Sequence, residues 1–511
     1  MDLLFSAIKD ANSGIIENMD NKLEEIKKLI SRYRFIDRIA LIEYLSFISI
    51  CPLHEVIEKK KGQGNYVFPW DAETIATIAL CFPHVSKNSN QVSFYSKCSS
   101  NYIKRMLCLL DESGVPEISK EMLDKYGYES IIRVLVSQQE KYQESALIKA
   151  YRYNYLFSYN IETKRLLCCK SGTEDYMVFA VLAVLPETLK KAIKNEEEMF
   201  GFYCFQKWIK HFLSCAIDHL SILSISLEDY IKQQNEKINK QTLNEIMNSY
   251  KVMYEKPLLF YNNEMIVLSH HCLDYACTDG LFINTTFKES DVIKQTFSRA
   301  LEDYLYKIAD EGALYETVPI ELRRKKYGPK KRRHDPEDVV IKNANTIIMF
   351  ESKTFIHQRK FWINDLDAVN AEYKKAIEGT KELLKSYHNF ISGSYKPFGT
   401  DDRDKKVFLV LVMLTYINLD YELIIKEVIK EKEFANDYQV LKDSLVITNL
   451  YSIEVYFLYK KDIVKDLIDL YQRHKLYEFG SKRTKCLPIE RIKSFDMFVK
   501  EIVDRALSQI K

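Results

Sequence analysis

The chain has 511 residues, of which 47% are hydrophobic and 29% charged, with 14 Gly and 11 Pro. A chain of this length exceeds one ordinary hydrophobic core, so we expect two to four domains, and the scarcity of turn-forming residues excludes a loop-rich all-β protein. The formal net charge of +2 excludes a global field that would attract nucleic acid, so any basic surface must be local.

The N-terminal 17 residues carry acids early and lack an uninterrupted apolar core, so they do not have the pattern of a secretory signal. The longest apolar runs, 176–186 and 406–417, reach only about half a membrane span. The 11 cysteines are odd in number and have no framework spacing, which is typical of free thiols in a reducing compartment. We therefore expect a cytoplasmic protein that does not bind membranes.

Residues 1–250 are predicted to be mainly helical. Residues 18–37 repeat apolar side chains at intervals of three and four, and residues 226–250 are polar, helix-prone and nearly free of Gly and Pro. This region has no Gly-rich phosphate loop and no nucleophile elbow. We expect it to act as a helical region that senses a signal or binds a partner protein.

Residues 251–284 are predicted to form a hairpin connector. Two short apolar runs within 257–269 are joined by Asn262-Asn263, a pair that favours a tight hairpin turn. The possible metal ligands that follow do not have the spacing of a known zinc site, so a buried patch is the simpler interpretation. They are His270, His271, Cys272 and Cys277.

Residues 285–511 are predicted to form an α/β domain with a mixed sheet covered by helices on both faces. The expected order is a helix over 290–312, a short strand over 314–320, strands at 338–341 and 345–355, a helix over 367–387, a strand over 405–416, a further helix, a strand over 444–459, and helices to the end.

Glu351 and Lys353 end the apolar run 347–350, which has the character of a central strand. Side chains two apart on a strand share a face, so these two project together, either as an ordinary ion pair or as part of a binding site. Asp338 opens the preceding strand, and a hairpin would place it beside Glu351. Asp335 is an alternative acid, but its His-Asp-Pro context favours a turn.

Two carboxylates and an ammonium group are therefore expected at one sheet edge. Neighbouring carboxylates raise each other's pKa unless a cation lies between them, and Mg²⁺ prefers a few carboxylates, water and phosphate oxygens. A lysine beside the ion could orient or deprotonate a water, or stabilise charge on a phosphate. The pattern indicates metal-assisted hydrolysis of a phosphodiester.

Asp338 followed by Glu351-Ser352-Lys353 after an apolar strand resembles the PD-(D/E)XK nuclease superfamily, over roughly residues 285 to 470. The resemblance implies a restriction-endonuclease-like fold and an Mg²⁺- or Mn²⁺-dependent endonuclease. Asp338 and Glu351 would bind the ion, with the Ser352 carbonyl as a further ligand, and Lys353 would position water and stabilise the phosphate.

Two helices flanking the motif also carry parts of the resemblance. Glu302 looks like the helix glutamate that many members use as an extra metal-site acid, although a solvated glutamate is an equal alternative. The helix after the motif resembles the one that often carries a Lys-Gln pair. Here the pair is Lys381-Glu382, so the glutamine is missing.

The basic stretch 323–333 precedes Asp338 and is a candidate nucleic-acid contact along the phosphate backbone. A solvated loop, or a nuclear signal in a eukaryotic source, are the alternatives. Its basic residues are Arg323, Arg324, Lys325, Lys326, Lys330, Lys331, Arg332 and Arg333.

Taken together, the sequence predicts a nuclease that cleaves DNA, with RNA as the alternative substrate. Architectures of this kind resemble restriction or anti-phage defence effectors, in which a sensor region controls the nuclease. A non-catalytic scaffold that binds nucleic acid or a protein partner is the rival from another class.

Overall fold

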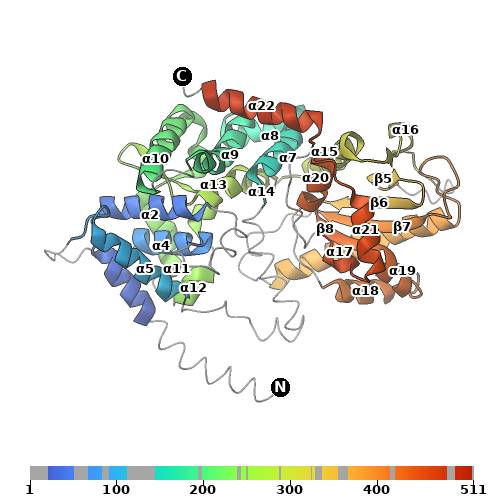
Figure 1. Ribbon diagram of the computed structural model, residues 1–511, viewed down its shortest axis with the longest axis horizontal. Helices are drawn as coiled ribbons and strands as arrows, with labels where there is room; N and C mark the ends of the chain where they lie inside the picture. The colour runs from blue at the N-terminus through green and yellow to red at the C-terminus, as the bar shows by residue number, and fades with distance from the viewer. Residues whose placement is uncertain are drawn as a thin grey trace, which may run out of the picture. The chain divides into compact units, whose positions relative to one another are not determined.

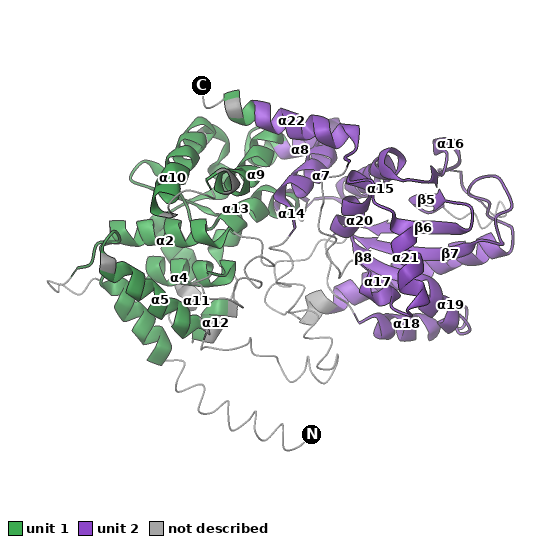
Figure 2. Cartoon of the chain, viewed as in Figure 1, with its two compact units in different colours: residues 1–119, 168–282, 505–511 green, residues 120–167, 283–504 purple. Residues whose placement is uncertain are grey.

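The computed structural model describes residues 21–50, 67–82, 91–111, 144–193, 198–238, 243–248, 251–286, 289–323, 325–327, 336–354, 366–414, 420–479 and 490–508. The chain divides into two compact units (Figure 2). Unit 1 comprises residues 1–119, 168–282 and 505–511, and unit 2 comprises residues 120–167 and 283–504. The expected helical region and α/β domain are both present, but the boundary between them differs from the predicted one.

Unit 1 is mainly helical, as its sequence predicts (Figure 1). Helix α4 is almost completely buried although it carries Asp71 and Glu73, and α13 packs against both α9 and α2. Residues 21–31 are helical, and the labelled helices lying wholly within unit 1 are α2 (Phe35–Ser49), α4 (Pro69–Cys81), α5 (Lys97–Asp111), α9 (Met177–Ala192), α10 (Glu198–Cys215), α11 (Leu227–Ile238), α12 (Leu243–Asn248) and α13 (His270–Cys277).

The predicted hairpin is confirmed, but it is not a connector. Strands β2 (Leu258–Tyr261) and β3 (Glu264–Val267) pair antiparallel around Asn262 and Asn263, which both have positive φ. Asparagine tolerates this left-handed conformation better than most residues, which is why the pair marks the turn. Strand β1 (Ser224–Ser226) pairs parallel with β2, so the hairpin belongs to a three-stranded sheet inside unit 1.

His270 and Cys272 lie in this unit and agree with the buried-patch interpretation. The His270 ring is buried and packs edge-on against Phe205 at 4.9 Å between ring centroids. Burial holds the pKa of His270 well below its usual value. The Cys272 thiol donates to the carboxylate of Glu73 at 3.3 Å.

Unit 2 is built on a five-stranded mixed sheet in the order β4-β5-β6-β7-β8. Strands β4 (Glu316–Thr317), β5 (Val339–Lys342) and β6 (Thr346–Lys353) pair antiparallel. Strands β6, β7 (Lys406–Met413) and β8 (Leu445–Asn449) pair parallel. Strand β7 is apolar without alternation because helices cover both faces of the sheet, as predicted.

Helix α17 (Leu366–Ile391) joins the parallel strands β6 and β7 and packs against both. On the other face, α15 (Asp291–Gly312) contacts β5 and β6, and α20 (Leu450–Leu458) contacts β7, β8 and α15. The Phe350 ring of β6 packs edge-on against Phe457 of α20 at 5.8 Å between centroids. Helices α18 (Tyr421–Ile429), α19 (Tyr438–Ser444) and α21 (Ile463–Gln472) complete the unit, and α22 (Lys493–Ser508) continues beyond its boundary at residue 504.

The predicted strand over 444–459 is wrong beyond residue 449. Residues 445–449 form β8, but the next nine residues form helix α20. Both segments are buried and apolar, so their hydrophobic pattern does not separate strand from helix. The local signal is Asn449, whose side chain caps the helix by accepting a hydrogen bond from the Ser452 amide at 2.7 Å.

Helix α7 (Ala146–Ser158) belongs to unit 2, which corrects the predicted boundary near residue 250. It packs against α15 and α20. Arg152 of α7 is completely buried and forms a two-bond ion pair with Glu454 of α20, at 2.9 and 2.6 Å. Tyr304 of α15 donates to the same carboxylate at 2.7 Å. Contacts made across about 300 residues of sequence cannot be found from local patterns.

Removing one partner of this buried pair should destabilise unit 2 strongly. Glu454→Gln leaves the Arg152 guanidinium buried without its counter-charge, which typically costs about 3–5 kcal/mol. Urea unfolding of the variant measures the loss. Arg473→Gln, which breaks the exposed pair with Asp469, should cost only about 0–1 kcal/mol. Equal losses in the two variants would contradict a structural role for the buried pair.

Among the helices described, none combines the length and the apolar character that crossing a bilayer requires. All of the described cysteines have free thiols, as the sequence predicts.

Candidate active site

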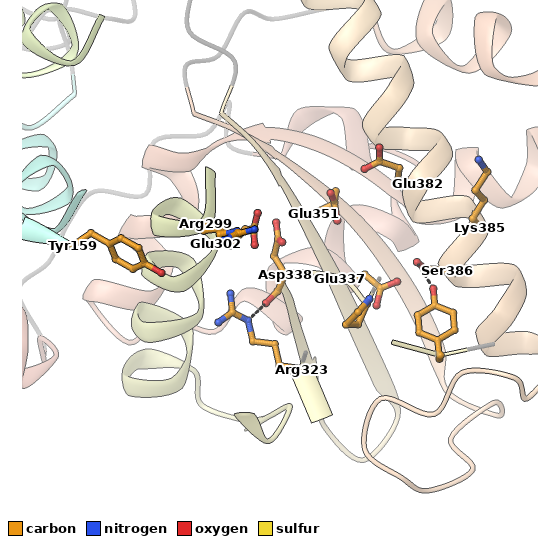
Figure 3. A pocket seen from close by; sticks show the side chains of 12 residues that line it. Tyr159, Arg299, Glu302, Arg323, Glu337, Asp338, Glu351, Glu382, Lys385 and Ser386 are labelled. Atoms are coloured by element: carbon orange, nitrogen blue, oxygen red, sulfur yellow. Dashed lines mark hydrogen bonds between the residues drawn. The ribbon is translucent and has the colours of Figure 1, made fainter. Parts of the chain in front are cut away.

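A pocket of about 810 Å³ lies in unit 2 at the edge of the sheet, between α15 and α17 (Figure 3). It gathers the predicted acids Glu302, Asp338 and Glu351 from three separate elements. The other lining residues are Tyr159, Arg299, Arg323, Tyr327, Pro336, Glu337, Glu382, Lys385 and Ser386.

The β5–β6 hairpin brings Asp338 next to Glu351, as its sequence predicts. Asn343 stabilises the turn, because its side chain accepts hydrogen bonds from the amides of Asn345 and Thr346. Val339 pairs with Phe350, so Asp338 and Glu351 follow as the next opposed positions of the same register. Their carboxylates lie side by side in Figure 3.

Ser352 orients the Asp338 carboxylate. Asp338 Oδ2 accepts hydrogen bonds from the Ser352 amide at 2.6 Å and from the Ser352 hydroxyl at 2.5 Å. Although one edge of Asp338 faces the pocket, burial raises its pKa, and the two Ser352 bonds and Lys353 partly oppose that rise. Ser352 therefore has a positioning role that sequence reasoning missed. Its carbonyl as a metal ligand stays a prediction.

Lys353 joins two carboxylates. Its Nζ donates to Glu351 Oε1 at 2.8 Å and also to Glu382 of α17. Burial acts to lower the pKa of Lys353, but the two carboxylates outweigh it and hold the pKa above its usual value. The ammonium therefore stays charged at neutral pH. That favours charge stabilisation and water orientation over proton abstraction, which the sequence had left open.

Gly379 lets α17 approach the sheet beside this lysine. A Cβ at this position would lie 2.5 Å from Leu411 Cδ1 and 3.2 Å from Lys353 Cε. Leu411 pairs in register with Glu351, so α17 covers the sheet face from which Glu351 projects. This close approach explains why Glu382, three residues further along α17, reaches Lys353.

Asp338 interacts electrostatically with each of the other two predicted acids. Burial raises the pKa of Glu302 to about 7, with Asp338 as the next cause. Burial and then Asp338 raise the pKa of Glu351 well above its usual value. Glu302 therefore lies close to Asp338 in the pocket, which favours the binding interpretation over a solvated helix glutamate.

The basic stretch is only partly described. Arg323 is 6% exposed and is held inside the protein: its guanidinium donates to the Asp338 carbonyl at 2.7 Å and to Asp303 at 2.6 Å. Arg323 thus supports the backbone of the acid cluster, which corrects its prediction as an arm lying along a nucleic acid. Lys325 and Lys326 are exposed. Arg324, Lys330, Lys331, Arg332 and Arg333 lie outside the described residues, as does the alternative acid Asp335.

Sequence reasoning missed several pocket residues. Arg299 lies one helical turn before Glu302, and Lys385 lies one turn after Glu382, so helical spacing from the motif would have found both. Glu337 is 3% exposed, and neither of its carboxylate oxygens has a hydrogen bond of acceptable geometry within the described chain. Burial raises its pKa, and the nearby hydroxyls of Ser386 and Tyr395 partly oppose this.

The donor chemistry of the pocket fits a hard divalent cation. Glu302, Asp338 and Glu351 offer carboxylate oxygens, the ligand type that Mg²⁺ and Mn²⁺ prefer, and their mutual repulsion would be relieved by a cation. Lys353 and Ser352 now hold two of these carboxylates. Within the described ranges, no three ligand-type side chains already converge in a metal-binding arrangement.

In comparisons with protein-family models, with curated proteins and with solved structures, the chain gave no match.

Proposed function

We propose that this protein is an Mg²⁺- or Mn²⁺-dependent nuclease of the PD-(D/E)XK type that hydrolyses phosphodiester bonds in DNA. One observation carries the proposal: Asp338, Glu351 and Glu302 from separate elements share one pocket, and Lys353 bonds directly to Glu351. The mixed sheet and its flanking helices supply the element order that such nucleases have.

Each residue has a role that follows from its contacts. Asp338 and Glu351, joined by Glu302, would hold the divalent ion. When bound, the ion would supply charge stabilisation on the phosphate and an acidified water. Ser352 fixes the direction of the Asp338 carboxylate, and Arg323 fixes the backbone at Asp338. Lys353 would orient the attacking water. It would also stabilise the negative charge on the phosphoryl oxygens when the phosphorus is five-coordinate in the transition state.

RNA on the same fold is the alternative substrate, because Arg and Lys contacts to a phosphate backbone do not distinguish the two polymers. A scaffold that only binds nucleic acid is less well supported. Such a module gains nothing from buried carboxylates that raise one another's pKa beside the expected phosphate path.

Removal of divalent metal tests the proposal. Purified full-length protein should cleave labelled DNA, single-stranded or duplex, with Mg²⁺ or Mn²⁺, and lose that activity in EDTA, because the ion that would supply charge stabilisation and an acidified water is removed. RNA substrates of the same sequence measure the alternative. Cleavage that continues unchanged in EDTA would refute the metal-dependent mechanism, and binding without cleavage under every metal condition would favour the scaffold.

A further inference from the structure

We infer that Arg299 and Lys385 hold the phosphates on either side of the cleaved bond, so that the substrate strand crosses the pocket from α15 to α17. This inference rests on the proposed nuclease function and adds the path of the substrate. It assigns two positioning residues that lie outside the sequence motif.

The two cations occupy opposite flanks of the acid cluster. Arg299 projects from α15 beside Glu302, Lys385 projects from α17 beyond Glu382, and Asp338 and Glu351 lie between them (Figure 3). Residues three apart share a helix face, so each helix presents an acid and a base to the same pocket. Burial acts to raise the pKa of Glu382, but this pKa is lowered mainly by Lys353, and Lys385 adds a smaller contribution, so its ammonium lies near this carboxylate.

Both cations are available to a ligand. Arg299 is exposed, Lys385 is half-buried, and neither forms an ion pair with another residue in the described part of the chain. The other two cations at the site are already engaged, Arg323 by Asp303 and Lys353 by two glutamates. A solvated helix cation is the simpler alternative for any one such residue, but it does not explain why both line the pocket.

The charge of the pocket requires such contacts. Five acids line it against three bases, so an approaching polyanion is repelled unless cations meet its phosphates. A divalent ion would serve the phosphate at the acid cluster. Phosphates further along the strand need other partners, and Arg299 and Lys385 are placed where the strand would enter and leave.

A strand held on both sides of the reacting phosphate is cleaved internally. The preferred substrate should therefore carry a phosphate on each side of the cleaved bond. Substrates that end at the cleaved bond should bind more weakly, because they lose one of the two contacts.

The test pairs each residue with one phosphate. Single-site oligonucleotides of the polymer that wild type cleaves are made with a neutral methylphosphonate at the phosphate before or after the cleaved one. Arg299→Gln and Lys385→Gln are assayed on each for kcat, KM and, in EDTA, Kd. Either variant should lose about tenfold in affinity on the native strand, the size of one charge-assisted contact. The loss should appear in KM more than in kcat.

The deciding result is non-additivity. The substrate affinity of Arg299→Gln should not fall further when the phosphate on one side of the cleaved bond is replaced by methylphosphonate. The affinity of Lys385→Gln should not fall further when the phosphate on the opposite side is replaced. Controls are Lys294→Gln on α15 and Lys374→Gln on α17, exposed lysines that do not line the pocket. Additive losses, or coupling of both residues to the same side, would overturn the inference while wild-type cleavage leaves the proposed function standing. Wild-type protein that neither binds nor cleaves would overturn both.

Discussion

Asp338→Asn should reduce the rate of cleavage by on the order of 10³-fold or more, because it removes a charge from the expected metal site that is worth several kcal/mol in the transition state. The fold should survive, since the Asn carbonyl oxygen can still accept the Ser352 amide and hydroxyl bonds. Burial raises the pKa of Asp338, so the folded protein disfavours the charged form of this side chain, and a neutral amide removes that burial cost.

The measurement is kcat/KM with Mg²⁺ together with the thermal unfolding midpoint. Asp437→Asn is the matched control, because Asp437 is a buried aspartate of the same unit that lies outside the pocket and faces His388. It should leave the rate within a few-fold of wild type. A fully active Asp338→Asn protein with a normal melting midpoint would remove Asp338 from the site.

Lys353→Met should reduce the rate of cleavage by about 10²–10³-fold, the usual loss for one preorganised charge that acts mainly in the transition state. Substrate binding should fall far less, because Arg299 and Lys385 remain. If Lys353 were only an ion-pair partner of Glu351, cleavage would continue at nearly the wild-type rate, whatever the change in stability. The comparison requires binding and cleavage of the same labelled strands.

Glu382→Gln tests whether the ion pair between Lys353 and α17 matters separately from the charge of Lys353. The variant keeps the bond between Lys353 and Glu351, so the ammonium remains in the pocket. We expect a change in rate of less than about tenfold, since no group near the phosphate is lost. If Glu382→Gln inactivates as fully as Lys353→Met, then Glu382 has a direct part in the reaction that its present contacts do not explain.

Features with local signals could be predicted from the amino-acid sequence. The β5–β6 hairpin follows from the apolar run, the alternation of side chains and the Asn343 turn, so the juxtaposition of Asp338 and Glu351 was predictable. Since residues two apart on a strand share a face, the direction of Lys353 was predictable as well. The Asn262-Asn263 turn and the order of elements in the α/β unit were found in the same way.

The packing of distant segments against one another could not be predicted from local sequence patterns. The assignment of α7 to unit 2 depends on Arg152 meeting Glu454, and the second carboxylate bound to Lys353 is Glu382, 29 residues away on a crossover helix. In the sequence, Arg323 is one residue of a basic run, whereas in the fold it is buried against Asp303 and the Asp338 carbonyl. Hydrophobic burial selects these arrangements through the sum of many weak contacts across the whole core, so no short stretch of sequence carries them.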